Sequence, residues 1–148
     1  MSSTHLSLHY HLLFSTKDRA ALIAGEWRNR LHAYLGGTVR TLNGIAEEIG
    51  GTIDHVHLLI GLRATHCLAD VLREIKAESS RWVHESIGLR AFSWQEGYGA
   101  FTVSASQRAA IKRYIADQEA HHRKRSFQEE YKEFLERHGI DYDETYLW

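Results

Sequence analysis

The chain has 148 residues, a formal net charge of -1 and a pI near 6.8. This length favours one domain over residues 1–148, with a core of its own. One cysteine excludes a disulfide framework and a cysteine-rich zinc site, and no apolar run approaches the ~20 residues of a membrane span. The N-terminus lacks the basic and apolar regions of a secretory signal, so we expect a cytoplasmic protein with no membrane partner.

Strands and helices alternate along the chain, as judged from the spacing of apolar residues. The predicted elements are a strand at 5–14, a helix at 21–42, strands at 44–49 and 53–60, a helix at 67–86, a loop and strand within 92–104, and helices at 107–122 and 126–138. The tight hairpin in the middle predicts an α+β fold with an antiparallel, ferredoxin-like (split βαβ) sheet and helices, followed by C-terminal helices.

Glycine and serine residues set the predicted boundaries. Gly36-Gly37 can break the first helix, because each glycine weakens a helix by about 1 kcal/mol. Gly50-Gly51 predicts a turn between two strands. Ser106 is expected to cap the helix that follows the last strand, and Gly139 is expected to stop the final helix.

Charge is distributed unevenly near the C-terminus. Residues 108–125 hold 6 basic and 2 acidic side chains, whereas residues 126–148 hold 2 basic and 7 acidic ones. A basic stretch can serve an anionic ligand, but a solvated helix face has the same composition. Charge alone therefore leaves both interpretations open.

His55 and His57 lie two residues apart in the clearest predicted strand, so both imidazoles leave the same face of the sheet. Val56 and Leu58 would anchor the opposite face in the core and hold the imidazoles rigidly, as a metal site requires. Two histidines are rarely enough, so a third ligand would come from elsewhere. Histidines satisfied by hydrogen bonds within the sheet are the alternative interpretation.

Tyr114 and Gln118 lie at positions i and i+4 of a predicted helix, so their side chains share one face. Ile111 and Ile115 lie on a neighbouring stripe that can dock this helix onto the sheet. A phenol and an amide would then point at the same place. The alternative is a half-buried core tyrosine beside a surface glutamine.

Five segments, taken together, carry a resemblance that none of them carries alone. The segment 54–60 places a hydrophobic residue between two histidines, and the other segments are 11–19, 72–80, 94–101 and 114–122. In this order they resemble the HUH family of single-tyrosine transposases, which includes small bacterial insertion-sequence enzymes and their REP-associated relatives. The ferredoxin-like fold that this resemblance implies agrees with the predicted order of elements.

The resemblance implies a role for each residue of the two motifs. Tyr114 would be the nucleophile, and His55, His57 and Gln118 would hold one divalent metal ion, Mg²⁺ or Mn²⁺. The substrate would be single-stranded DNA with hairpins at element ends, cut and rejoined through a 5′-phosphotyrosine intermediate. The resemblance also implies a homodimer that can share its active sites, and the sequence alone leaves open which chain supplies Tyr114 to each site.

Basic and aromatic side chains near these segments are candidates for contacts with DNA. Basic side chains would bind phosphates, and aromatic rings could stack on exposed bases, worth ~1–3 kcal/mol each. The basic candidates are Lys17, Arg19, Lys76, Arg113, Arg123 and Lys124, and the aromatic candidates are Trp94 and Tyr98. An ordinary surface charge or a core aromatic is the alternative for each.

Two further pairs of histidines have open roles. His9 and His11 form a second His-x-His pattern, and they face the same side as the motif histidines if the first and third strands are neighbours. We interpret this pair as packing or as residues near DNA, with metal ligation as the alternative. His121 and His122 are interpreted as a solvated helix end, with a place at the border of the site as the alternative.

The predicted function is therefore a metal-dependent DNA transposase, and three alternatives remain open. A domesticated, non-mobile REP-associated nuclease would use the same chemistry. A non-catalytic nucleic-acid-binding module would bind DNA but would not cleave it, whichever metal is added. A small metal-dependent hydrolase that uses water would keep its turnover after Tyr114→Phe and would form no covalent adduct.

Overall fold

The computed structural model describes residues 3–122 and 125–147. Its strands are β1 (His9–Ser15), β2 (Ile45–Gly51), β3 (His55–Gly61) and β4 (Gly99–Val103). Its helices are α1 (Gly25–Thr41), α2 (Leu68–Trp82), α3 (Arg108–Ala116), α4 (Gln118–His122) and α5 (Phe127–Arg137). None of the described helices has the length and apolar character needed to cross a bilayer.

The four strands form one antiparallel sheet in the order β2-β3-β1-β4. α1 connects β1 to β2, and β3 lies between these two strands, which is the arrangement of a split βαβ unit. The chain therefore has the α+β, ferredoxin-like architecture that the sequence predicted. β1 and β3 pair at the centre of the sheet in a register that places Leu13 opposite His57 and Ser15 opposite His55.

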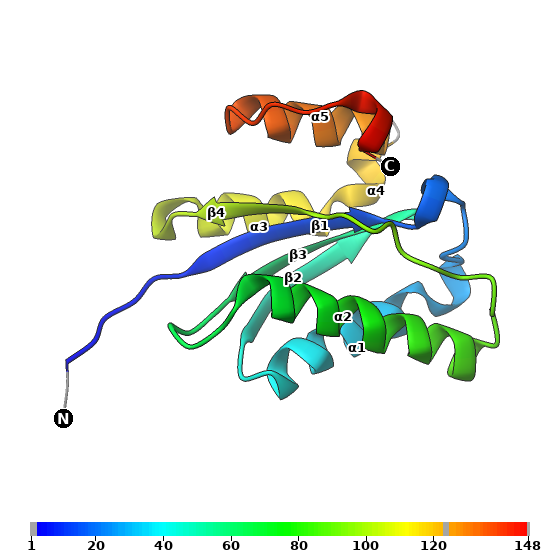
Figure 1. Ribbon diagram of the computed structural model, residues 1–148, viewed down its shortest axis with the longest axis horizontal. Coiled ribbons are helices and arrows are strands. Elements are labelled where there is room, and N and C mark those ends of the chain that lie inside the picture. Colours follow the sequence, from blue (N-terminus) through cyan, green and yellow to red (C-terminus); the bar gives the residue numbers. More distant parts are fainter. Residues whose placement is uncertain (1–2, 123–124, 148) are drawn as a thin grey trace.

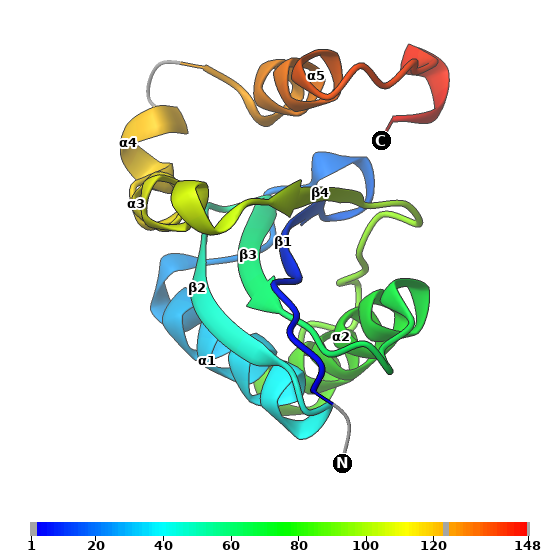
Figure 2. The same cartoon turned by 90° about the vertical axis from the view of Figure 1, so that its left-hand side faces the viewer.

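One face of the sheet packs against α1 and α2 (Figures 1 and 2). Alternate residues of β1 and β3 point into this core, and Leu12, Phe14, Val56 and Leu58 are fully buried there. Since side chains alternate across a strand, the residues between them point to the other face.

The C-terminal helices cover that other face. Figure 1 shows α5 on the side of the sheet away from α1 and α2, and Figure 2 shows α3 and α4 near the β2 edge. Ile115 of α3 and Phe134 of α5 belong to the two apolar clusters on this side. The layer between the sheet and these helices contains three buried histidines of the central strands, His11, His55 and His57.

Three predicted boundaries were wrong. α1 continues through Gly36-Gly37, because its apolar face is buried on the sheet and this burial offsets the ~1 kcal/mol cost of each glycine. Gly50-Gly51 end β2 instead of forming a turn, since both residues pair with β3. Ser106 lies in a single helical turn at Ala105–Gln107, so α3 begins after it without a side-chain cap.

Candidate active site

β3 presents His55 and His57 from a strand that is buried along its whole length. The exposed fraction of both residues is 0%. Each ring has a partner at its Nδ1 atom, which is Oδ1 of Asp54 at 2.8 Å for His55 and Nε2 of His11 at 2.7 Å for His57. These contacts and the packing of the strand fix the directions in which the two Nε2 atoms point.

α3 approaches the sheet closely enough to bring Tyr114 over the histidines. The centroid of the Tyr114 ring lies 5.9 Å from that of His57. This approach depends on Gly50 of β2, because a Cβ atom there would lie 2.1 Å from the carbonyl oxygen of Ile115. Gly50 therefore serves the close packing of a helix on a strand.

Gln118 follows an interruption in the helix that carries Tyr114. The predicted helix divides into α3 and α4 at Asp117, whose backbone leaves the helical conformation. The Nε2 group of Gln118 still donates to the carbonyl oxygen of Tyr114 at 3.3 Å, and its Oε1 atom lies 3.0 Å from Nε2 of His55. The structure thus brings together, within one chain, the residues predicted as nucleophile and as metal ligands.

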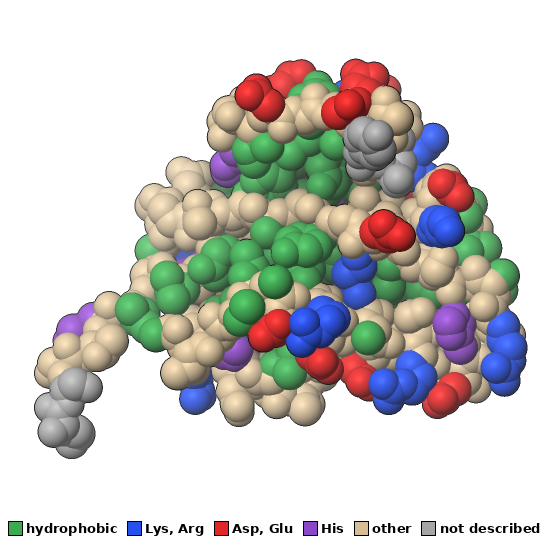
Figure 3. Space-filling model, in the orientation of Figure 1, with side chains coloured by type: hydrophobic (Ala, Val, Ile, Leu, Met, Phe, Trp, Pro, Cys, Tyr) green, Lys and Arg blue, Asp and Glu red, His purple; other side chains and the backbone are tan. Residues whose placement is uncertain are grey.

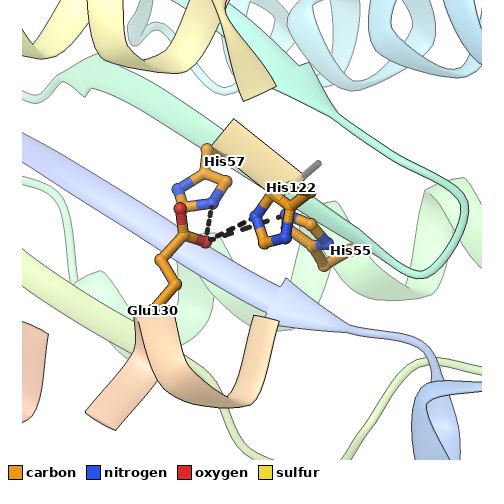
Figure 4. Close-up of side chains that lie close together, drawn as sticks. All are labelled: His55, His57, His122 and Glu130. Carbon is orange, nitrogen blue, oxygen red and sulfur yellow. Dashed lines mark hydrogen bonds and ion pairs between the residues drawn. The ribbon is translucent and has the colours of Figure 1, made fainter. Parts of the chain in front are cut away.

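Two further residues, one of them half-buried, complete a group of candidate metal ligands (Figure 4). One ligand atom from each of His55, His57, His122 and Glu130 lies within 4.8 Å of the others. Oε1 of Glu130 lies 2.8 Å from Nε2 of His57, 3.1 Å from Nε2 of His122 and 3.8 Å from Nε2 of His55. The interpretation of His122 as a solvated helix end was therefore wrong, because α4 turns this side chain into the site.

The carboxylate of Glu130 also accepts a hydrogen bond from the hydroxyl of Tyr114. Burial favours a higher pKa for Glu130, but hydrogen bonds from His122, His57 and Tyr114 outweigh it and hold the pKa far below its usual range. Burial and the adjacent carboxylate raise the pKa of Tyr114 well above its usual value, and Arg125 opposes them only in part. At neutral pH the site therefore holds an ionised glutamate and a protonated phenol.

Two histidines at the centre of the sheet are uncharged at neutral pH. Burial lowers the pKa of His57 to about 4, although Glu130 acts in the opposite direction. Burial also lowers the pKa of His11 well below its usual range, and the neighbouring His57 lowers it further. A neutral imidazole keeps the lone pair with which it binds a metal.

The groups around His55 provide a place for a cation. The carboxylate of Asp54 can only accept, so Nδ1 of a neutral His55 carries the proton and donates to it. Nε2 then presents a lone pair to Oε1 of Gln118 at 3.0 Å and to Oε1 of Glu130 at 3.8 Å. These facing acceptor atoms leave a place between them that a metal ion could occupy.

This donor set suits a divalent transition metal. Imidazole ligands favour Mn²⁺ or Zn²⁺ over Mg²⁺, which prefers oxygen ligands. Asp54 and His11 occupy the positions of outer partners that orient metal-bound histidines. The site could therefore hold the divalent metal that the sequence resemblance implies, and its ligands leave the identity of the ion open.

The residues predicted to contact DNA lie at different depths. Those that are exposed are Lys17, Arg113 and Tyr98, while Arg19 is half-buried and Arg123 and Lys124 lie outside the described residues. Exposure leaves the first three accessible to a large ligand. Their contacts with DNA stay a prediction.

Trp94 and Lys76 have partners within the protein instead. The Trp94 ring is 7% exposed, packs edge-on against Phe14 at a centroid distance of 4.8 Å, and donates from Nε1 to Ser79. The ammonium group of Lys76 donates to the carbonyl oxygens of residues 95–97 at 2.5–2.9 Å. Trp94 is thus a core residue with no free ring face for a base, and Lys76 holds the loop before β4.

The signal in the sequence for Glu130 is its place on the apolar face of α5. Phe127, Tyr131 and Phe134 are buried on this face, and Glu130 lies among them with an exposed fraction of 0%. A carboxylate on the buried stripe of an amphipathic helix is rare unless it is paired. That position, rather than any motif, indicates a site residue.

α5 covers the site and presents an acidic surface to solvent. Acidic side chains lie over α5 and the C-terminal segment in Figure 3. The exposed acidic residues of this part of the chain are Glu129, Glu136, Asp141, Asp143 and Glu144. A surface of this sign repels the phosphates of nucleic acid.

A family model described as "Transposase IS200 like" matches residues 4–118. The matched part includes both motif histidines, Tyr114 and Gln118. It ends at the start of α4, so His122 and Glu130 lie beyond it.

Three proteins illustrate the similarity. The ISDra2 transposase TnpA of Deinococcus radiodurans is 29% identical over 119 residues, which are 75% of this chain and 84% of that protein. A crystal structure of a transposase from Deinococcus radiodurans R1 has a TM-score of 0.63 and 25% identity, and the match covers 80% of this chain and 96% of that one. The structure of a REP-associated tyrosine transposase bound to a REP hairpin shares the fold, with a TM-score of 0.60 and 15% identity. That match covers 82% of this chain and 74% of the other.

Proposed function

The chain belongs to the IS200-like transposase family, and from this premise we propose that it cuts and rejoins single-stranded DNA through a covalent bond to Tyr114. The observation that carries the proposal is the position of the Tyr114 hydroxyl, which shares Glu130 with His57 as a hydrogen-bond partner. The nucleophile thus meets the candidate metal ligands at one point. A divalent metal held by His55 and His57, with Gln118 beside them, would polarise the scissile phosphate and neutralise charge in the transition state.

Tyr114 supplies the oxygen for the new bond. This oxygen would bond to the phosphorus of the scissile phosphodiester while the bond from phosphorus to the 3′ oxygen breaks. The products are a 5′-phosphotyrosine and a free 3′ hydroxyl, which takes up a proton as the phenol loses one. The bond from phosphorus to Tyr114 keeps the energy of the phosphodiester bond that was broken. The 3′ hydroxyl of another DNA end can therefore attack it and rejoin the strand without ATP.

Glu130 occupies the place that a phosphate oxygen would take in this reaction. Its carboxylate bonds to Tyr114 on one side and to His57 and His122 on the other. An anionic phosphate between the nucleophile and a metal would need the same position. The described arrangement is therefore closed, and α5 has to move before DNA reaches Tyr114.

Hairpin-bearing single-stranded DNA is the substrate class that we propose. A REP-associated tyrosine transposase with this fold is described as bound to a REP hairpin, which supports testing hairpins first. The exposed side chains of Lys17, Arg113 and Tyr98 would contact phosphates and bases. We also propose the homodimer that the resemblance implies, with a complete site in each copy, because Tyr114 and the candidate metal ligands meet within one chain.

Adduct formation on a denaturing gel tests the proposal. The wild-type protein, Mn²⁺ and labelled hairpin DNA should give a covalent protein–DNA band that EDTA abolishes. Tyr114→Phe should lose this band, whereas Tyr142→Phe should keep it, since that phenol bonds to Glu136 away from the site. A band that survives in Tyr114→Phe contradicts the role of Tyr114, and DNA binding without cleavage in any metal favours a non-catalytic module.

A further inference from the structure

His11 is buried beside the site, and the strand-transfer reaction proposed above does not use it. Its exposed fraction is 1%, and its Nε2 atom lies 2.7 Å from Nδ1 of His57. The β1–β3 register places Leu13 opposite His57, so His11 meets His57 diagonally across the two strands on one face. On its other side the His11 ring packs edge-on against Phe134 of α5, with a centroid distance of 4.9 Å.

We propose that His11 is a positioning residue that accepts the Nδ1 proton of His57 when a metal binds, so that Nε2 of His57 presents its lone pair to the metal. This inference rests on the metal chemistry proposed above. A neutral imidazole has one N–H donor and one acceptor nitrogen, so a hydrogen bond between two such rings specifies which nitrogen of each carries the proton. His11 would thus determine the tautomer of His57.

The pair has two proton arrangements that differ at both rings. Without a metal, the Glu130 carboxylate accepts from Nε2 of His57 at 2.8 Å, so Nδ1 of His57 accepts and Nε2 of His11 donates. With a metal on Nε2 of His57, the proton of that ring must lie on Nδ1, and Nε2 of His11 must accept. His11 then carries its own proton on Nδ1. Each ring keeps one proton throughout, so the exchange brings no net charge into the buried layer.

The two motif histidines differ in the chemistry of this outer partner. His55 donates to the carboxylate of Asp54, which is half-buried at the start of the strand. His57 already has the buried carboxylate of Glu130 at its Nε2 atom, and a second carboxylate at its Nδ1 atom would be expensive to bury. A neutral imidazole can accept from His57 and avoids that cost.

Metal titration of His11 variants tests the inference. His11→Leu removes the acceptor, while His11→Gln keeps an amide oxygen near the position of Nε2. We expect His11→Leu to bind Mn²⁺ about 10–100-fold more weakly than the wild type by calorimetry, and His11→Gln to bind closer to the wild type. His9→Leu is the matched control on the same strand face, because His9 lies near Glu47 rather than near the pair. Thermal melts would verify that each variant is folded.

Nitrogen NMR of the histidine rings measures the tautomers of His11 and His57, which a purely structural role of His11 would leave unchanged. In the wild type we expect the His57 proton on Nε2 without metal and on Nδ1 with diamagnetic Zn²⁺, with His11 changing in parallel. A folded His11→Leu variant that binds Mn²⁺ as tightly as the wild type would overturn the inference, as would a His57 tautomer that is the same with and without Zn²⁺. Neither measurement uses DNA, so this inference can fail while Tyr114 still forms an adduct, and the reverse also holds.

Discussion

At the residue scale, burial decides the charge state of the histidines. Burial lowers the pKa of His57 to about 4, and burial together with Arg28 lowers the pKa of His32 to about 4. An unfolded histidine titrates near 6.5. Between about pH 4 and 6.5 the unfolded chain therefore binds more protons at these residues than the folded chain does.

This difference predicts that stability falls on acidification. The free energy of unfolding should decrease by up to ~1.4 kcal/mol per pH unit for each such histidine as the pH falls from 6.5 towards 4. Glu130 does not offset this loss. Its lowered pKa stabilises the fold at pH values above the usual glutamate pKa, and this stabilisation is lost only when the pH falls below that value. Thermal melts from pH 7.5 to 4.5 should show the loss, with a shallower slope in His32→Leu. An unchanged melting temperature between pH 6.5 and 4.5 would argue against neutral buried histidines.

At the element scale, the distance between α3 and β2 places the nucleophile. Gly50→Ala would put a Cβ atom 2.1 Å from the backbone of Ile115, so α3 and Tyr114 must shift. We expect a destabilisation of about 1–3 kcal/mol and a large loss of adduct. Gly37→Ala is the matched control, since outside the backbone of α1 the nearest atom to its Cβ would be the flexible end of Arg40 at 3.9 Å, and it should stabilise α1 by about 0.5–1 kcal/mol. Urea unfolding and the adduct gel measure both effects, and wild-type behaviour of Gly50→Ala would refute the packing role.

At the scale of the whole molecule, the buried face of α5 covers the site, and its acidic outer face repels the phosphates of nucleic acid. Glu130→Gln keeps the shape of the side chain but removes the negative charge that takes the place of a phosphate. We expect this variant to bind hairpin DNA more tightly and to form adduct faster than the wild type. Its melting temperature should be lower, because the donors His57, His122 and Tyr114 lose an ionised acceptor. Glu136→Gln on the exposed side of α5 is the control for charge alone. A folded Glu130→Gln protein that binds metal normally and forms no adduct would instead make Glu130 a required group in the chemistry.

The local patterns in the sequence explain why the centre of the site was predictable. The alternation around His55 and His57 and the spacing of Tyr114 and Gln118 depend only on the geometry of one strand and of one helical turn. Glu130 belongs to α5, and it reaches the site only because that helix folds back over the sheet. No local pattern specifies that return.

Some glycine and tryptophan residues are each compatible with two different structural roles. Gly50-Gly51 predicts a turn, but glycine is equally required where another backbone comes close, as α3 does here. Trp94 resembles a base-stacking residue in a loop, yet its large apolar ring is buried against Phe14 and Phe92. Tertiary packing decides between such alternatives, and it is not encoded in a short segment.

Mass spectrometry of the trapped adduct tests the role of Tyr114 most directly. Trypsin cleaves after Arg113 and Arg123, so Tyr114 falls in a peptide of residues 114–123 that contains no other tyrosine. After nuclease trimming of the DNA, this peptide should carry the added mass of a 5′-linked nucleotide, and fragmentation should locate it on Tyr114. A nucleotide found on any other peptide, such as one that contains Tyr131, would contradict the assignment of Tyr114 as the nucleophile.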